Sequence, residues 1–188
     1  EESKKIKAIQ AHYKKNKLHG EAIEYDPSGI KVSSTCYKEG IKNGEAKLFH
    51  HNEKTAIYLT FKDNLREGLS YQYYPSGKIY KQIEFVKDQK EGEEKTFFED
   101  GLLTSIYRYK SGQLEGFVEH WNKDGVMTFK AMYKNGVQHG KFIKYYDDGS
   151  PRIEQQFVYG KLDGIKKTYT TEGEVTETCY KQGIKISE

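Results

Sequence analysis

The sequence predicts an all-β fold, an elongated single antiparallel sheet of tandem 24-residue β-hairpins, and three observations support this prediction. Glycines recur along the 188 residues with a fixed period. The segments between the turns that these glycines predict have five to eight residues, which is too short for helices and suits strands. The apolar fraction is low at 35%, yet the chain carries 16 Tyr, 9 Phe and 1 Trp. This composition indicates an extended fold with a thin, aromatic-rich core.

The glycines fall into three sets that share one period, and together the sets hold all 18 glycines of the chain. The first set has a spacing of 24 residues at every step: Gly20, Gly44, Gly68, Gly92, Gly116, Gly140 and Gly164. We interpret these seven as structural turn glycines. The period predicts one repeat array over residues 1–188, with about seven units between residues 13 and 183. Residues 1–12 are expected to form an entering strand or N-terminal cap, and residues 174–188 a C-terminal cap.

The second set follows the first by nine residues, and Glu53 is its single substitution: Gly29, Gly77, Gly101, Gly125, Gly149 and Gly173. Its glycines follow Pro or Asp in segments such as DPS and YDD, which predicts a type I turn closed by a left-handed glycine. At His50–Glu53, where the glycine is missing, we expect a degraded turn in which Asn52 takes the left-handed conformation.

The third set predicts a second turn, at about residues 38–44 of the first full unit. Its glycines are Gly40, Gly112, Gly136, Gly160 and Gly183. The other units have Asn16, Asn64 or Asp88 at this phase. Because Gly, Asn and Asp enter the left-handed region most easily, this phase should have positive φ throughout. Each unit is therefore expected to be one β-hairpin.

Aromatic residues form two columns on the same period. The first column is Tyr25, Phe49, Tyr73, Phe97, Trp121, Tyr145 and Tyr169. The second is Tyr13, Tyr37, Phe61, Phe85, Tyr109, Tyr133, Phe157 and Tyr180. Rings are doubled at 73–74, 97–98 and 145–146, and side chains alternate between the faces of a strand, so one ring of each pair is expected to be exposed. The candidate partner-binding aromatics are therefore Tyr74, Phe98, Trp121 and Tyr146, since Tyr and Trp are enriched in protein interfaces.

Written out, the units read NGEAKLFHHNEK, EGLSYQYYPSGK and HGKFIKYYDDGS, joined by YKEGIKNG, YKNGVQHG and FVYGKLDG. This pattern resembles the MORN repeat, and particularly the bacterial variant found in the YwqK-like antitoxin component family. The eukaryotic Y-x-G-x-W core is not followed closely, because Trp121 is the only Trp. The resemblance implies an elongated array of hairpins that acts as a scaffold for protein contacts, and in some members for membrane lipids.

The residues point to no catalytic, cofactor or metal site. Cys36 and Cys179 occupy one repeat phase about six units apart, too far for a disulfide. No Cys or His pair has the spacing of a zinc site. Carboxylates before the first glycine set, such as Glu67 and Glu115, form either a row that attracts a basic partner or a solvated turn edge. We expect a protein that is not an enzyme.

The 31 Lys and Arg oppose 28 Asp and Glu, and this near-balance argues against a nucleic-acid partner. We therefore expect a non-catalytic scaffold that binds a protein partner. The resemblance and a first residue other than Met favour the bacterial envelope or secretion, with the cytoplasm left open. One alternative is an antitoxin or immunity protein that binds a toxin. Another is a peripheral phospholipid-binding module, ranked last because the charge is evenly mixed.

Overall fold

The structure is a computed structural model that describes residues 8–187, and every element in this range is a β-strand. The predicted all-β, antiparallel hairpin fold is confirmed. The chain divides after Gln89 into two compact units, which are described separately. Of the expected entering strand over residues 1–12, the part over residues 1–7 lies outside the described residues. No helix in the described range is long and apolar enough to cross a membrane.

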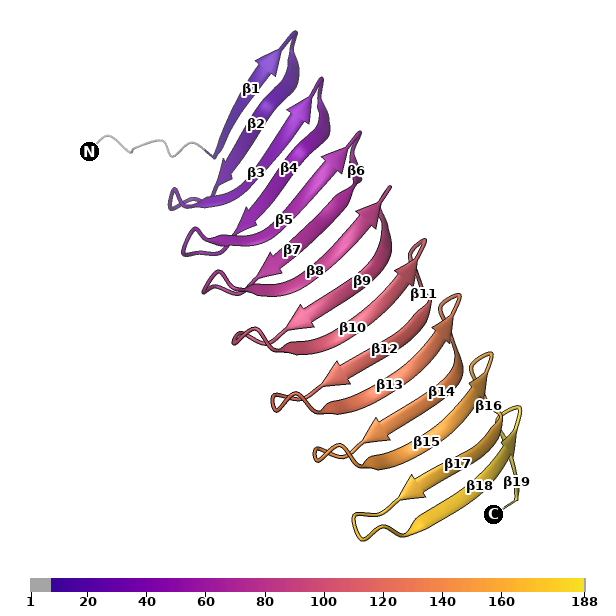
Figure 1. Ribbon diagram of the computed structural model, residues 1–188. Helices are drawn as coiled ribbons and strands as arrows, with labels where there is room; N and C mark the ends of the chain where they lie inside the picture. Colours follow the sequence, from indigo (N-terminus) through magenta and orange to yellow (C-terminus); the bar gives the residue numbers. More distant parts are fainter. Residues whose placement is uncertain (1–7, 188) are drawn as a thin grey trace. The chain divides into compact units, whose positions relative to one another are not determined.

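Unit 1 ends at Gln89, and its neighbouring strands pair antiparallel, with β6 and β7 both pairing with β5 (Figure 1). Its strands are β1 (Ile9–Lys14), β2 (Lys17–Tyr25), β3 (Lys31–Lys38), β4 (Ile41–Phe49), β5 (Thr55–Lys62), β6 (Leu65–Arg66), β7 (Gly68–Tyr73) and β8 (Ile79–Val86).

Unit 2 begins at Lys90 and repeats the same antiparallel hairpins. Its strands are β9 (Gln89–Phe97), β10 (Leu103–Lys110), β11 (Gln113–Leu114), β12 (Gly116–Trp121), β13 (Met127–Lys134), β14 (Val137–Tyr145), β15 (Pro151–Val158), β16 (Lys161–Leu162), β17 (Gly164–Tyr169), β18 (Val175–Lys181) and β19 (Ile184–Ser187).

One connection in each repeat is a two-residue type I′ turn, in which both central residues have positive φ. Glu39 and Gly40, with φ of 53° and 89°, form such a turn between the paired residues Lys38 and Ile41. Equivalent turns are centred on 15–16, 63–64, 87–88, 111–112, 135–136, 159–160 and 182–183. The prediction of positive φ at the third glycine phase is therefore confirmed at every unit. The positive φ of the residue before it was not predicted.

The other connection is a type I turn closed by a left-handed residue, which we call the 3:5 turn, and it agrees with the prediction for the second glycine set. In the first such turn, the Asp26 N–H donates to Ile30 O and the Gly29 N–H donates to Asp26 O, both at 2.9 Å. The expectation that Asn52 takes the left-handed conformation in the turn at His50–Glu53 is wrong. Glu53 itself adopts φ of 60°, while the Asn52 side chain accepts a hydrogen bond from the Lys54 N–H at 3.2 Å.

The first glycine set lies within strands or at their first residue, and not in the reversing turn expected over residues 38–44. In the β3–β4 pair, Cys36 alone lies opposite residues 43–45, so the second strand bulges there. Gly44 has φ of 105°, and a Cβ added to it would lie 3.2 Å from the Cβ of Cys36. Glycine is required at this bulge by both backbone conformation and space.

The last repeat is one residue short, and the register shows which residue it lacks. In earlier repeats the strand after the 3:5 turn has one extra residue, such as Ala56 between the partners of Leu48 and Phe49. In the β17–β18 pair, Thr168 and Tyr169 face Thr176 and Val175 with no residue skipped. The deletion therefore removes a bulge and leaves the hairpin otherwise unchanged.

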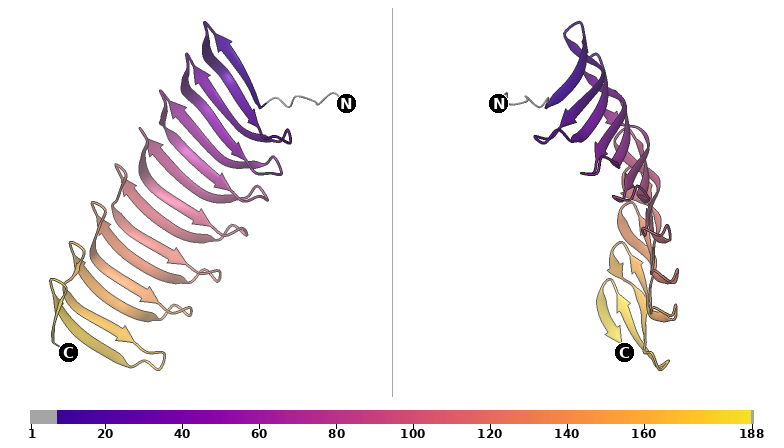
Figure 2. Two further views of the ribbon diagram at one scale, coloured as in Figure 1. Left: turned by 180° about the vertical axis from the view of Figure 1, so that it is seen from behind. Right: turned by 90° about the vertical axis from the view of Figure 1, so that its left-hand side faces the viewer.

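Each unit is a single layer of strands, as the edge-on view shows (Figure 2). In each unit we call one surface face A, which carries the buried residues Ala46 and Ile83 in unit 1 and Val118 and Ala131 in unit 2. The opposite surface is face B. Its central cross-strand row is Ser34, Lys47, Tyr58, Tyr71 and Gln82 in unit 1, and Lys95, Ile106, Glu119, Lys130, Ile143, Glu154, Lys167 and Glu177 in unit 2. No large side chain among the described residues is fully buried, which is consistent with a one-layer core.

The two aromatic columns lie on opposite faces and at opposite ends of the strands. Tyr73 and Tyr145 lie on face B beside the 3:5 turns, whereas Phe61 and Tyr133 lie on face A beside the type I′ turns. In unit 2, ring contacts on face A also run through the middle of the strands. Successive centroids are 4.9–5.9 Å apart along Tyr107, His120, Phe129, Phe142 and Phe157.

Candidate interaction surfaces

Three of the predicted partner-binding rings, Tyr74, Phe98 and Tyr146, are the first residues of 3:5 turns, and Trp121 ends β12. All four are half-buried, as are the rings paired with the first three, so neither ring of a pair is fully open. The Tyr146 hydroxyl donates to Tyr169 O at 2.7 Å, which links one turn to the next repeat. These rings thus have packing roles, and their role in binding stays a prediction.

The carboxylates before the first glycine set do not form a free acidic row. The Glu67 carboxylate accepts a hydrogen bond from the backbone N–H of Lys87 at 2.8 Å, twenty residues later. Glu91 accepts in the same way from Ser111, Glu115 from Asn135 and Asp163 from Gln182. The sequence signal for this role was the constant distance from each carboxylate to the next type I′ turn, and our interpretation missed it.

A second hydrogen bond anchors each type I′ turn after the first to the repeat before it. The N–H of its second central residue donates to a backbone carbonyl 22 residues earlier in most repeats, as from Gly136 to Leu114 O at 2.8 Å. Most of these turns are therefore held by one backbone and one side-chain acceptor. The sequence left this row as either a surface for a basic partner or a solvated turn edge, and the structure shows that its carboxylates help to position the next hairpin.

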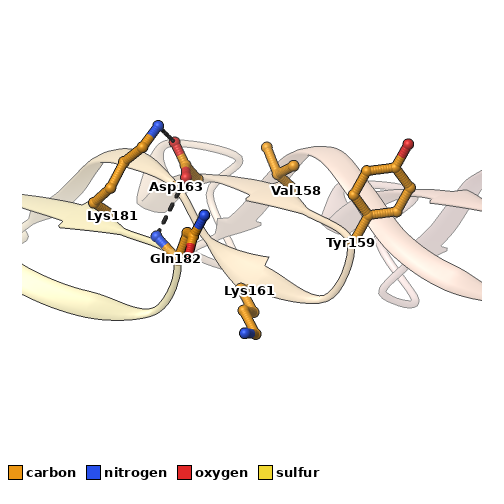
Figure 3. A pocket seen from close by; sticks show the side chains of 6 residues that line it. All are labelled: Val158, Tyr159, Lys161, Asp163, Lys181 and Gln182. Carbon is orange, nitrogen blue, oxygen red and sulfur yellow. Dashed lines mark hydrogen bonds and ion pairs between the residues drawn. The ribbon is translucent and has the colours of Figure 1, made fainter.

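A shallow hollow of about 410 Å³ lies at the type I′ turn edge near the end of unit 2 (Figure 3). At one end of it, Lys181 Nζ lies 3.0 Å from Asp163 Oδ1, and the Gln182 N–H donates to Asp163 Oδ2 at 3.2 Å. The Lys181 side chain and this N–H hold the pKa of Asp163 below its usual value. Tyr159, 72% exposed, lies at the other end. The hollow therefore has an exposed ring at one end and the Lys181–Asp163 ion pair at the other.

Face B of unit 1 carries a larger hollow, of about 560 Å³, lined by Lys47, Tyr58 and Tyr73 together with residues of two 3:5 turns. The Tyr71 ring lies 6.3 Å from that of Tyr58 and 6.2 Å from that of Tyr73. Burial raises the pKa of the Tyr58 and Tyr73 phenols, so both stay protonated at neutral pH. The Lys47 ammonium lies 5.6 Å from the Tyr58 centroid and 2.7 Å from Glu45 Oε2, so this surface presents neutral rings beside an ion pair.

Face B of unit 2 has a hollow of about 250 Å³ lined by Phe117, Lys130, Lys141, Ile143 and Tyr145.

Ion pairs fix the charged side chains beside this hollow. Glu119 is buried and binds Arg108 Nη1 at 2.7 Å and Lys130 Nζ at 2.8 Å. Burial acts to raise the pKa of Glu119, but the hydrogen bonds and charges of Lys130 and Arg108 outweigh it and lower the pKa.

Residue types that often carry chemistry are used in packing here. His120 Nε2 lies 2.9 Å from the Tyr107 hydroxyl inside the face A ring row, and burial lowers the pKa of this histidine. Cys36 and Cys179 are free thiols, both half-buried. Within residues 8–187, no three His, Cys, Asp or Glu side chains gather in a group that could hold a metal ion.

Comparison with known families finds similarity to the family described as MORN repeat variant, at residues 18–39, 66–87 and 138–159. Each matched segment begins just after one type I′ turn and ends in the next, so it contains one hairpin and its 3:5 turn. The segments are in phase with the 24-residue period and cover about a third of the chain. No curated protein matches the chain. The similarity and the hairpin fold together indicate a repeat scaffold.

Proposed function

We propose that this chain is a non-catalytic scaffold that binds a protein partner on face B. The rings Tyr74, Phe98, Trp121 and Tyr146 border that surface at the 3:5 turns. No second sheet or helix of the described residues covers either face of a unit, and the observation that selects face B is its hollows. On each unit this face has a hollow lined by aromatic rings and lysines.

The composition of these hollows suits a protein partner better than a small substrate. Tyr, Trp and Phe contribute large contact areas with few rotatable bonds, and they are enriched at interfaces. The hollows are shallow and lie along a sheet, whereas small-molecule sites are usually enclosed clefts. Ion pairs such as Lys130–Glu119 already hold charged side chains in place, which lowers the entropy lost on binding.

The test is site-specific photo-cross-linking in an extract of the source organism. A benzophenone amino acid replaces Tyr71 or Phe117 on face B, and Leu48, which is 46% exposed on face A, serves as the matched control. We expect adducts of one mass from both face B positions and none from Leu48. Adducts from Leu48 alone, or from no position, would refute binding at face B.

The border rings are tested by replacing Tyr74, Phe98 and Trp121 with Ser in a chain that carries the cross-linker at Phe117. Tyr146 is left unchanged, because its hydroxyl bonds the next repeat. We expect a lower adduct yield with an unchanged far-UV circular dichroism spectrum. An unchanged yield would remove these rings from the binding surface and leave the proposal for the hollows standing.

A further inference from the structure

The type I′ turn edge of unit 1 is rich in unpaired lysines. Six lysines on this edge are exposed, and none forms an ion pair with a described residue: Lys14, Lys15, Lys17, Lys38, Lys62 and Lys87. Each of the four type I′ turns of this unit has at least one of them. Nearby acids offset them only in part, since Asp88 is paired with Arg66 and Glu67 binds the Lys87 backbone. Glu39 and Asp63 are the exposed acids at these turns.

The 3:5 turn edge of unit 2 has the opposite charge. Seven carboxylates on this edge are exposed and outside every ion pair of the described residues: Glu99, Asp100, Asp124, Asp147, Asp148, Glu172 and Glu174. All four 3:5 turns of the unit contribute at least one. The bases near this edge include Lys123, Lys144 and Arg152. The cationic groups of Lys123 and Arg152 lie 5.9 Å and 5.6 Å from the ring centroids of Phe98 and Tyr146.

The two edges have the same period. Each advances by one hairpin per repeat, which is two strands or about 9.6 Å. Four basic turns and four acidic turns at equal spacing can come into register at every repeat. An unrelated acidic protein would have no reason to match this spacing, whereas a second copy of the chain matches it by construction.

Charge and apolar surface agree with this pairing. Residues 1–89 carry 16 Lys and Arg against 12 Asp and Glu, while residues 90–188 carry 15 against 16. The basic edge also exposes Ile41, Leu65 and Val86, and the acidic edge exposes Leu102 and Val175.

We propose that the type I′ edge of unit 1 in one copy docks on the 3:5 edge of unit 2 in a second copy. The contact is heterologous, because the two copies use different surfaces. It uses the turns and not the face B hollows, and the two proposed surfaces meet at Phe98 and Tyr146, which begin 3:5 turns of the acidic edge. Exposed ion pairs are individually weak and screened by salt, and we therefore expect reversible association that is strongest at low ionic strength.

The experiment is sedimentation velocity on the intact chain at about 0.01 M and about 1 M salt, between which the screening length falls from ~30 Å to ~3 Å. We expect concentration-dependent association at low salt and monomer at high salt. A monomer at both salt concentrations would overturn the proposal. Binding to phosphatidylserine vesicles without self-association would also overturn it, in favour of an anionic membrane surface.

Charge reversal identifies the surfaces. The basic-edge variant carries Lys14→Glu, Lys38→Glu and Lys62→Glu, and the acidic-edge variant carries Glu99→Lys, Asp124→Lys and Asp147→Lys. Each is expected to weaken self-association by about tenfold or more, because three charge contacts become repulsive.

Mixing the two variants is expected to restore association, since each retains one native edge and the two reversed edges complement each other. The matched control is Lys110→Glu with Lys134→Glu, at the same repeat phase in unit 2, which should associate like the wild type. Failure of the mixture to associate would overturn the pairing of these two edges, and an equal loss in the control would show that net charge governs association. Thermal melts of all variants check that the hairpins remain folded.

Discussion

A type I′ turn such as Glu39–Gly40 is held by the repeat before it, whereas a 3:5 turn such as residues 26–30 is closed by its own atoms. The Gly40 N–H donates to Leu18 O at 2.8 Å, 22 residues earlier. In the 3:5 turn, the Asp26 carboxylate accepts from the Ser28 and Ile30 N–H groups, both at 2.9 Å. Repeats are therefore linked by a regular backbone bond at the type I′ edge, whereas the links at the 3:5 edge come from individual side chains, such as Asn52 Nδ2 to Pro75 O at 2.8 Å. This difference explains why the 3:5 edge tolerates Glu53 in place of glycine and the loss of a bulge residue in the last hairpin.

The largest effect is expected from matched glycine substitutions on the two sides of this comparison. A Cβ at Gly140, in the bulge after a type I′ turn, would lie 3.3 Å from Met132 Sδ with φ at 102°. At Gly125, in a 3:5 turn, it would meet nothing within 4 Å with φ at 77°. We expect Gly140→Ala to lower the free energy of unfolding by about 3 kcal/mol and Gly125→Ala by about 1 kcal/mol, measured by urea titration. Equal losses would show that the bulge is no more demanding than the turn.

The sequence predicted the parts of this arrangement that depend on residue type. Positive φ at Asn16, Asn64 and Asp88 followed from the few residues that enter the left-handed region easily. Positive φ at Lys87 and Tyr159 did not, because these types carry no such signal and the turn is imposed by its neighbours. Gly44, which lies in a bulge, was assigned to the turn from the sequence. A glycine indicates that the backbone needs positive φ, but it does not indicate whether a turn or a bulge requires it.

The candidate site was predicted less well than the fold. Periodicity placed Tyr74, Phe98 and Tyr146 correctly in the repeat, but alternation in a strand did not apply to them, because each begins a turn. The sequence also did not reveal that the type I′ edge of unit 1 is basic and the 3:5 edge of unit 2 is acidic. Over the whole chain the charges nearly cancel, and only the fold separates the lysines of one edge from the carboxylates of the other.

A smaller effect is expected from removing one side-chain anchor of a type I′ turn. Glu115→Ala deletes the acceptor of the Asn135 N–H, which now lies 2.7 Å from the carboxylate. We expect a loss of about 1 kcal/mol and faster hydrogen exchange at the Asn135 amide. Glu99→Ala is the control, because it removes an exposed acid from the 3:5 edge and should change stability by less than about 0.5 kcal/mol. If both variants lose the same stability, the anchor contributes nothing specific.

The smallest effect concerns pH at the last type I′ turn. The Lys181 side chain and the Gln182 N–H lower the pKa of Asp163 from its usual 3.8. This interaction is therefore intact above pH 3.8 and is lost as the pH falls through the lowered value. We expect the Gln182 amide resonance to shift only in that acidic range, and Asp163→Asn to abolish the shift. A Gln182 transition near the ordinary pKa, or its persistence in the variant, would contradict the anchor.

The direction of these anchors matters for the growing chain on the ribosome. Every acceptor that positions a type I′ turn precedes it by about 20 residues, so it has already been synthesised when the turn emerges. A new 24-residue unit appears about every 1–5 s at typical synthesis rates, whereas a β-hairpin forms in about 1–10 μs. Each hairpin can therefore settle on its predecessor before the next one exists. Within each unit, the order of translation is also a workable order of folding.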